Sequence, residues 1–114
     1  AATAQITPQA VENLGLTVRQ AKGIQRHLWQ LGHDPGTIDG QLGTNSWKAM
    51  QRSLRSYGYS DAIDGIVGPN TIKALQRMLK QHWGYSGAID GIAGSGTRAA
   101  FARCGTAWAN NYGY

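Results

Sequence analysis

The sequence has little charge, almost no cysteine and no long apolar run. Of its 114 residues, 15% are charged and 41% are hydrophobic, a balance that excludes disorder driven by charge repulsion. No run reaches the roughly 18 apolar residues of a membrane-spanning helix, so we expect no membrane partner. One cysteine, Cys104, excludes an internal disulfide framework and a multi-cysteine zinc site, and we interpret it as a small buried hydrophobe.

Acidic residues are also scarce, with six Asp and Glu against eleven Lys and Arg, for a net charge of +5. Glycoside hydrolysis normally uses two carboxylates, and the sole glutamate is Glu12. A muramidase-like enzyme that uses Glu12 with one loop aspartate stays open as the alternative function. The three histidines are scattered along the chain and lack a His-Glu-x-x-His spacing, so no metal and no cofactor is expected: His27, His33 and His82.

Glycine, in contrast, is abundant, and much of it belongs to an internal repeat. The segment Ile-Asp-Gly-Gln-Leu-Gly-Thr-Asn-Ser at 38–46 returns as Ile-Asp-Gly-Ile-Val-Gly-Pro-Asn-Thr at 63–71. It returns again as Ile-Asp-Gly-Ile-Ala-Gly-Ser-Gly-Thr at 89–97. The segments before and after these loops also align with one another, which indicates a repeating unit of helix and loop.

The Asp-Gly pair of each loop has a structural interpretation. An aspartate carboxylate accepts a backbone N–H two residues on, and the following glycine takes the positive φ of a tight turn. We therefore assign turn roles to Asp39, Gly40, Asp64, Gly65, Asp90 and Gly91. Calcium is disfavoured because each loop offers only one carboxylate and no trailing glutamate.

Apolar residues three or four apart between the loops predict four main helices. Thr17 and Gln20 form a capping box for the first, and three glycines suit left-handed helix ends: Gly32, Gly58 and Gly84. A short leading helix is expected from Thr7-Pro8 to Gly15. The fold class is therefore all-α: one domain of three overlapping helix-loop-helix repeats at 17–104, with an N-terminal segment at 1–16 and an irregular tail at 105–114.

One stretch also resembles a known family. Leu28-x-x-Leu31-Gly32-His33-x-Pro35-Gly36-x-Ile38-Asp39-Gly40-x-Leu42-Gly43, running into Ser46-x-x-Ala49-Met50-Gln51, is similar to the peptidoglycan-binding domain found beside bacterial cell-wall hydrolases. The resemblance implies a small helical domain with two such loops and non-catalytic attachment to peptidoglycan. This sequence departs from the family pattern by an extra repeat, by Ser46 in place of threonine and by Gly96 in the third loop.

Two tryptophans stand at repeat positions where another copy carries a charge. Trp29 aligns with Arg55, and Trp47 aligns with Arg98, so we expect both rings to be at least partly exposed. Exposed aromatic rings stack on sugars or peptide stems, which makes both residues candidate ligand contacts. The alternative is that the segment at 11–14, or Trp108, folds over them.

Arginines also recur at one helical position, and a row of them would attract the anionic groups of a cell-wall polymer: Arg26, Arg52, Arg77 and Arg103. We select Arg26 and Arg52 as ligand contacts. Tyr59 and Tyr85 are expected to close their loops, with a hydroxyl left for a ligand. Nucleic acid is disfavoured because the charge is thinly spread and no groove-reading motif is present.

The expected function is therefore non-catalytic binding of peptidoglycan by a monomer that targets an associated hydrolase to the wall. The start Ala1-Ala2-Thr3-Ala4 resembles what signal-peptidase cleavage leaves, which favours secretion, although a trimmed chain would look the same. Besides the muramidase, a binder of another polysaccharide such as chitin stays open.

Overall fold

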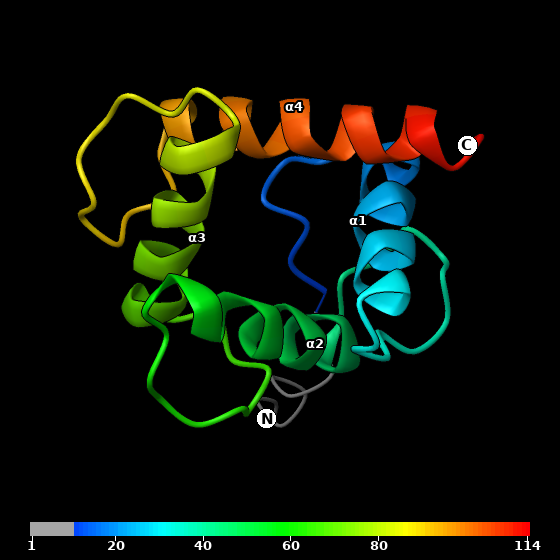
Figure 1. The fold of residues 1–114 in the computed structure, drawn as a ribbon, viewed down its shortest axis with the longest axis horizontal. Coiled ribbons are helices and arrows are strands. Elements are labelled where there is room, and N and C mark those ends of the chain that lie inside the picture. Colours follow the sequence, from blue (N-terminus) through cyan, green and yellow to red (C-terminus); the bar gives the residue numbers. More distant parts are fainter. Residues whose placement is uncertain (1–10) are drawn as a thin grey trace, which may run out of the picture.

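The computed structural model describes residues 11–114, which form four α-helices and no strand. These are α1 (Val18–Gln30), α2 (Thr44–Leu54), α3 (Pro69–His82) and α4 (Ser95–Asn111), with a 3-10 turn, η2 (Arg55–Tyr57), after α2. The predicted all-α class is confirmed. In Figure 1 the helices form the four sides of a frame, and the three long loops lie outside its corners.

The helix ends follow the local sequence. Thr17 caps α1 through the predicted box: its hydroxyl accepts the Gln20 N–H at 3.2 Å, and its own N–H donates to the Gln20 side chain at 2.9 Å. The glycines expected at helix ends have φ values of +86°, +89° and +73°, which an L side chain rarely adopts: Gly32, Gly58 and Gly84.

The corner between α4 and α1 is closed by direct helix packing. A Cβ at Gly23 would lie 2.4 Å from the Ala109 backbone nitrogen, and one at Gly105 would lie 2.8 Å from the Gln20 Cβ. Only glycine permits this approach of the two backbones. The last helix thus returns to the first and completes the frame (Figure 1).

Two predictions about the chain ends are wrong. Residues 11–16 are not helical: they carry a turn at Leu14 and Gly15, and in Figure 1 they run across the frame. The start of the predicted leading helix, at 7–10, lies outside the described residues. The predicted irregular tail is mostly helical, because α4 continues to Asn111 along α1 and Arg19 of α1 donates to the Tyr114 carbonyl at 2.7 Å.

The core lies where the inner faces of the helices meet. Its largest fully buried apolar side chains come from the first loop and from α2, α3 and α4: Leu42, Trp47, Leu54, Leu75, Leu79 and Phe101. Each such side chain contributes roughly 1.5–3 kcal/mol through burial. This core holds the helices in fixed positions around the frame.

Candidate functional site

Each loop of the frame folds around a glutamine from the helix before it. In the second loop, the N–H groups of Asp64 and Gly65 donate to the Gln51 side-chain oxygen at 3.0 and 2.8 Å. The Gln51 amide donates in turn to the Asp64 carboxylate and the Ile66 carbonyl, both at 3.1 Å, and to the Thr71 hydroxyl at 3.2 Å. In the first loop, Gln25 bonds in a similar way to Gly40, Asp39, Gln41 and Ser46. In the third loop, Gln76 bonds to Gly91, Asp90, Ile92 and Thr97.

The loop aspartates make the predicted turns. Their carboxylates accept the N–H groups of Gln41, Ile66 and Ile92 at 2.9, 2.9 and 3.0 Å, and the glycines that follow them have φ values of +79°, +75° and +75°. These bonds lower the pKa of each carboxyl, mainly through the backbone N–H at Asp39 and Asp64 and through the Gln76 amide at Asp90. All three carboxylates are thereby engaged in shaping the backbone.

The buried glutamines were missed at the level of sequence, although the repeat contained a signal for them. Gln25, Gln51 and Gln76 hold one position in the helices that precede a loop. At the same position in α4, the last described helix, the residue is Ala102. A glutamine that recurs in each helix before a repeated loop indicates a contact between that side chain and the loop.

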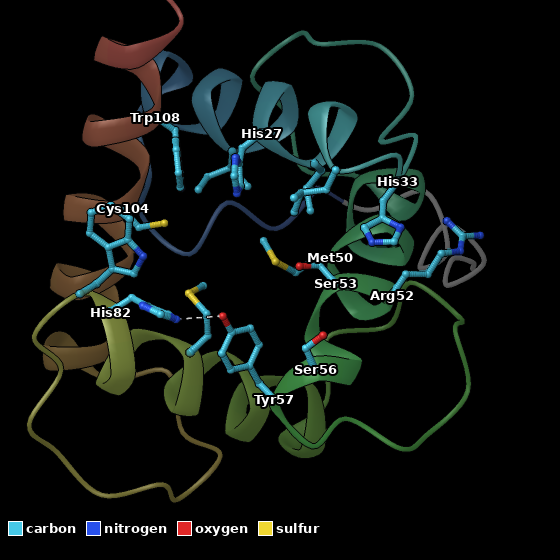
Figure 2. Close-up of a pocket in the computed structure, with 15 residues that line it drawn as sticks. His27, His33, Met50, Arg52, Ser53, Ser56, Tyr57, His82, Cys104 and Trp108 are labelled. Carbon is cyan, nitrogen blue, oxygen red and sulfur yellow. Dashed lines mark hydrogen bonds between the residues drawn. The ribbon is translucent and has the colours of Figure 1, made fainter.

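A cavity of about 650 Å³ lies at the centre of the frame (Figure 2). All four helices contribute to its wall, and it collects the three histidines that are scattered in the sequence: His27, His33 and His82. His82 shares a hydrogen bond of 3.1 Å with the Tyr57 hydroxyl. Within residues 11–114, no three His, Cys, Asp or Glu side chains are grouped so that they could hold a metal.

One helical position supplies a cavity residue from every helix. Two residues after the glutamine position, the four helices carry His27, Ser53, Met78 and Cys104, and all four line the cavity. The four side chains differ completely in chemistry. The repeat therefore places corresponding residues around one space but does not repeat their identity.

Aromatic rings connect the cavity to the outer surface beside α1 and α4. The His27 ring stacks on Trp108 with centroids 3.7 Å apart and 9° between the planes, and its Nδ1 shares a 3.2 Å hydrogen bond with the Tyr112 hydroxyl. Partial burial lowers the pKa of His27. The Arg26 guanidinium lies 5.0 Å from the Trp29 ring centre and 5.4 Å from that of Tyr112. We call Arg26, Trp29 and Tyr112 the aromatic platform.

The two candidate tryptophans differ in exposure to solvent. Trp29 is 54% exposed, which confirms the expected exposure. The same expectation was wrong for Trp47, which is 1% exposed and packs against Phe101. The segment at 11–14 covers it, and its indole N–H donates to the Glu12 carbonyl at 2.9 Å. Trp47 is therefore part of the core and is removed from the candidate ligand contacts.

The tyrosines also belong to the scaffold. Tyr59 and Tyr85 are buried, and their hydroxyls donate to the carbonyls of Ala62 and Ala88, both at 2.6 Å. The hydroxyl that we expected to be left for a ligand is thus engaged in closing the loop. Of the predicted ligand contacts, Arg26 and Trp29 lie together on the platform, whereas Arg52 lines the cavity.

Glu12, the alternative catalytic residue, lies in a turn. Its carboxylate accepts the Leu14 N–H at 3.0 Å, which is the bond pattern of the loop aspartates, and it does not line the cavity. Among residues 11–114, no aspartate or glutamate lines that cavity.

A scan against models of protein families, a search of curated proteins and a search of solved structures each gave no match. Within the described part of the chain, no helix is both long enough and apolar enough to cross a bilayer.

Proposed function

We propose that this chain is a secreted, monomeric, non-catalytic module that binds bacterial peptidoglycan and targets an associated hydrolase to the wall. Three overlapping helix-loop-helix units, similar to those of the peptidoglycan-binding domain family, would form its scaffold. The family resemblance motivates the choice of ligand. The aromatic platform is the observation that carries the binding role.

The platform suits a polymer of sugars and peptides. Trp29 is about half exposed, and an indole ring in that position is a natural stacking partner for a sugar or a peptide. Arg26 lies over that ring and over Tyr112, so its guanidinium is held in place and adds positive charge beside the ring. The net charge of +5 favours an anionic polymer over a cationic one such as chitosan.

The positions of the carboxylates favour holding over cutting. A glycosidase normally places two carboxyl groups on either side of the scissile bond. Here the three loop aspartates and Glu12 accept backbone N–H groups, and no acid within the described residues lines the cavity. The central cavity therefore gives no support to the muramidase alternative. Asp39 and Asp64 both line a separate hollow over the first loop, but each carboxylate there is bonded to a backbone N–H and to a glutamine amide.

Co-sedimentation with insoluble peptidoglycan tests the proposal. We expect Trp29→Ala to lower retention about fivefold or more, since loss of an aromatic stacking contact costs about 1 kcal/mol or more. Ile92→Ala is the matched control because it removes another exposed apolar side chain, far along the chain, and should leave retention unchanged.

Two results would contradict the proposal. One is retention on chitin with none on peptidoglycan. The other is clearing of a wall suspension by the purified chain, with loss of that activity in Glu12→Gln, which would establish the enzyme alternative.

A further inference from the structure

The central cavity collects aromatic and methionine side chains that the core leaves partly exposed. Several apolar residues pack against the core but keep part of their surface in solvent. Within residues 11–114, the aromatic and methionine members of this group all line the cavity, and none of its aliphatic members does: Tyr57, Met78, Trp83 and Trp108. Apolar surface that is wet at a cavity wall favours a ligand that covers it.

The chemistry of this wall favours an aromatic ligand. Trp83 and Trp108 meet edge to face, with centroids 5.9 Å apart and 71° between the planes. Both methionines of the chain, Met50 and Met78, also line the cavity. Indole rings pack favourably on other rings, and a thioether makes favourable contacts with ring edges and adapts to their shape. An aliphatic ligand would gain less from the same wall.

The cavity offers no partner to a charged ligand. Among residues 11–114, no Asp or Glu lines it, so a bound cation would lack a counter-ion there. Arg52 is the one Lys or Arg of these residues that lines it, and in Figure 2 its guanidinium extends away from the cavity. At about pH 8, imidazole side chains are mostly neutral, so the histidines supply no cation either. A carboxylate would lose its hydration without gaining an ion pair, which favours an uncharged ligand.

The α2 side of the wall adds a neutral hydrogen-bonding group. Ser53 lines the cavity and is partly exposed, and Figure 2 shows its hydroxyl beside Met50. The Tyr57 hydroxyl and the His82 ring, in contrast, bond to each other at 3.1 Å. Since a serine hydroxyl both donates and accepts, it can pair with a polar substituent of a ligand.

The volume of about 650 Å³ is in the range of small-molecule sites. We propose that the central cavity binds an uncharged molecule with fused aromatic rings and one polar substituent, the rings against the Trp83–Trp108 pair and the methionines and the substituent at Ser53. This site is separate from the proposed wall-binding function, because no residue of the aromatic platform lines the cavity.

Calorimetric titration of the unmodified chain at about pH 8 with three ligands of similar shape tests the proposal. The probe is 2-naphthol, which is aromatic, uncharged and carries one hydroxyl. We expect 2-naphthoate to bind about tenfold or more weakly, because its carboxylate is desolvated without a partner. We expect 2-decalol, the saturated analogue, to bind about threefold or more weakly, because the contacts between aromatic rings are lost.

A substitution that fills the cavity tests the location of the site. Ser53→Leu places a larger side chain on the cavity wall, and we expect it to weaken 2-naphthol binding about tenfold or more. Ser60→Leu makes the same change at an exposed position outside the cavity and should bind as the unmodified chain does. Denaturant unfolding of both variants checks that they are folded.

Three results would overturn the proposal: no binding of 2-naphthol, binding of 2-naphthoate or 2-decalol as tight as that of 2-naphthol, or equal effects of Ser53→Leu and Ser60→Leu. The comparison of ligands uses the unmodified chain, so it decides the matter even where Ser53→Leu does not fold. Retention on peptidoglycan is measured separately, and its failure would contradict the proposed function without affecting the cavity site.

Discussion

The loops and the central cavity are formed by the same repeat, but they use it in opposite ways. At the position that faces the loop, three helices carry the same residue: Gln25, Gln51 and Gln76. The side-chain oxygen of each accepts the N–H of the loop glycine, at 2.8, 2.8 and 3.0 Å. Two residues further along, where the side chains line the cavity, each of the four helices carries a different residue: His27, Ser53, Met78 and Cys104.

The difference follows from what each position must satisfy. A buried polar network is stable only when all its donors and acceptors are paired, so one arrangement is repeated at each loop. A cavity wall has no such requirement and is free to vary. Within this repeat, the constant inward-facing position belongs to the scaffold of the loops, and the variable one lines the cavity.

The largest effect is expected at Cys104, on the cavity wall. Burial raises the pKa of its thiol to about 12, against an ordinary value of 9.0. Since only the thiolate reacts, the folded chain should react with an aromatic disulfide reagent at about pH 8 roughly a thousandfold more slowly than the unfolded chain. Reaction rates measured with and without denaturant check this. Rates within tenfold of each other would mean that the thiol is accessible and that the cavity wall opens readily.

The second effect is a difference in stability between two substitutions in α2, one at Gln51, which faces the loop, and one at Ser53, which faces the cavity. Gln51→Ala leaves the N–H groups of Asp64 and Gly65 without their buried partner, and we expect it to lower the free energy of unfolding by about 3 kcal/mol. Ser53→Ala, on the cavity wall, should change it by less than about 0.5 kcal/mol. Denaturant unfolding of both variants measures the contrast. Similar losses at the two positions would remove the distinction between scaffold and wall.

The smallest effect is the pH dependence of the free energy of unfolding. The loop residue Asp64 and the cavity residue His27 should contribute to it in different pH ranges. The pKa of Asp64 is lowered by the Ile66 N–H and the Gln51 amide, so below about pH 4 the unfolded chain binds more protons there than the folded chain. Its stabilisation is present above about pH 4 and is lost as the pH falls through the folded value. Burial lowers the pKa of His27, so its contribution is present above about pH 6.5 and is lost as the pH falls through its own folded value.

We expect each contribution to be about 1 kcal/mol or less, because both groups have access to solvent. Unfolding in urea at about pH 7, 5 and 3 measures them. Asp64→Asn should reduce, but not abolish, the loss of stability at low pH, because the pKa values of Asp39 and Asp90 are lowered in the same way. His27→Asn should remove the loss between about pH 7 and 5 and leave the low-pH loss unchanged. An increase in stability from pH 7 to pH 5 would contradict the assignment to His27.

The regular parts of the fold were predictable because they depend on local rules. The capping box at Thr17, the left-handed glycines after α1 and α3, and the aspartate turns follow from short-range chemistry within a few residues. The repeat made these signals visible three times over. The extent of α4 was not predictable in the same way, because the helix continues beside α1 through a contact between distant segments.

The prediction of the site failed where a distant segment decides the environment. Trp47 aligns with a charged residue of another copy, yet it is buried, and its indole N–H donates to the Glu12 carbonyl of the segment at 11–14. For Trp29 the same alignment was right because nothing covers that ring to the same extent. Aligned repeats share their local geometry but not their neighbours.

By itself, the sequence determined the four main helices, the start of α1, the left-handed glycines that follow three of them and the turns of the loops, since hydrogen bonds and steric limits over a few residues suffice for these. Only the tertiary structure decided that α4 closes on α1, that three distant histidines line one cavity and that Trp47 is buried while Trp29 is exposed. Those features depend on packing between segments far apart in the chain, and a local pattern carries no information about which of them will meet.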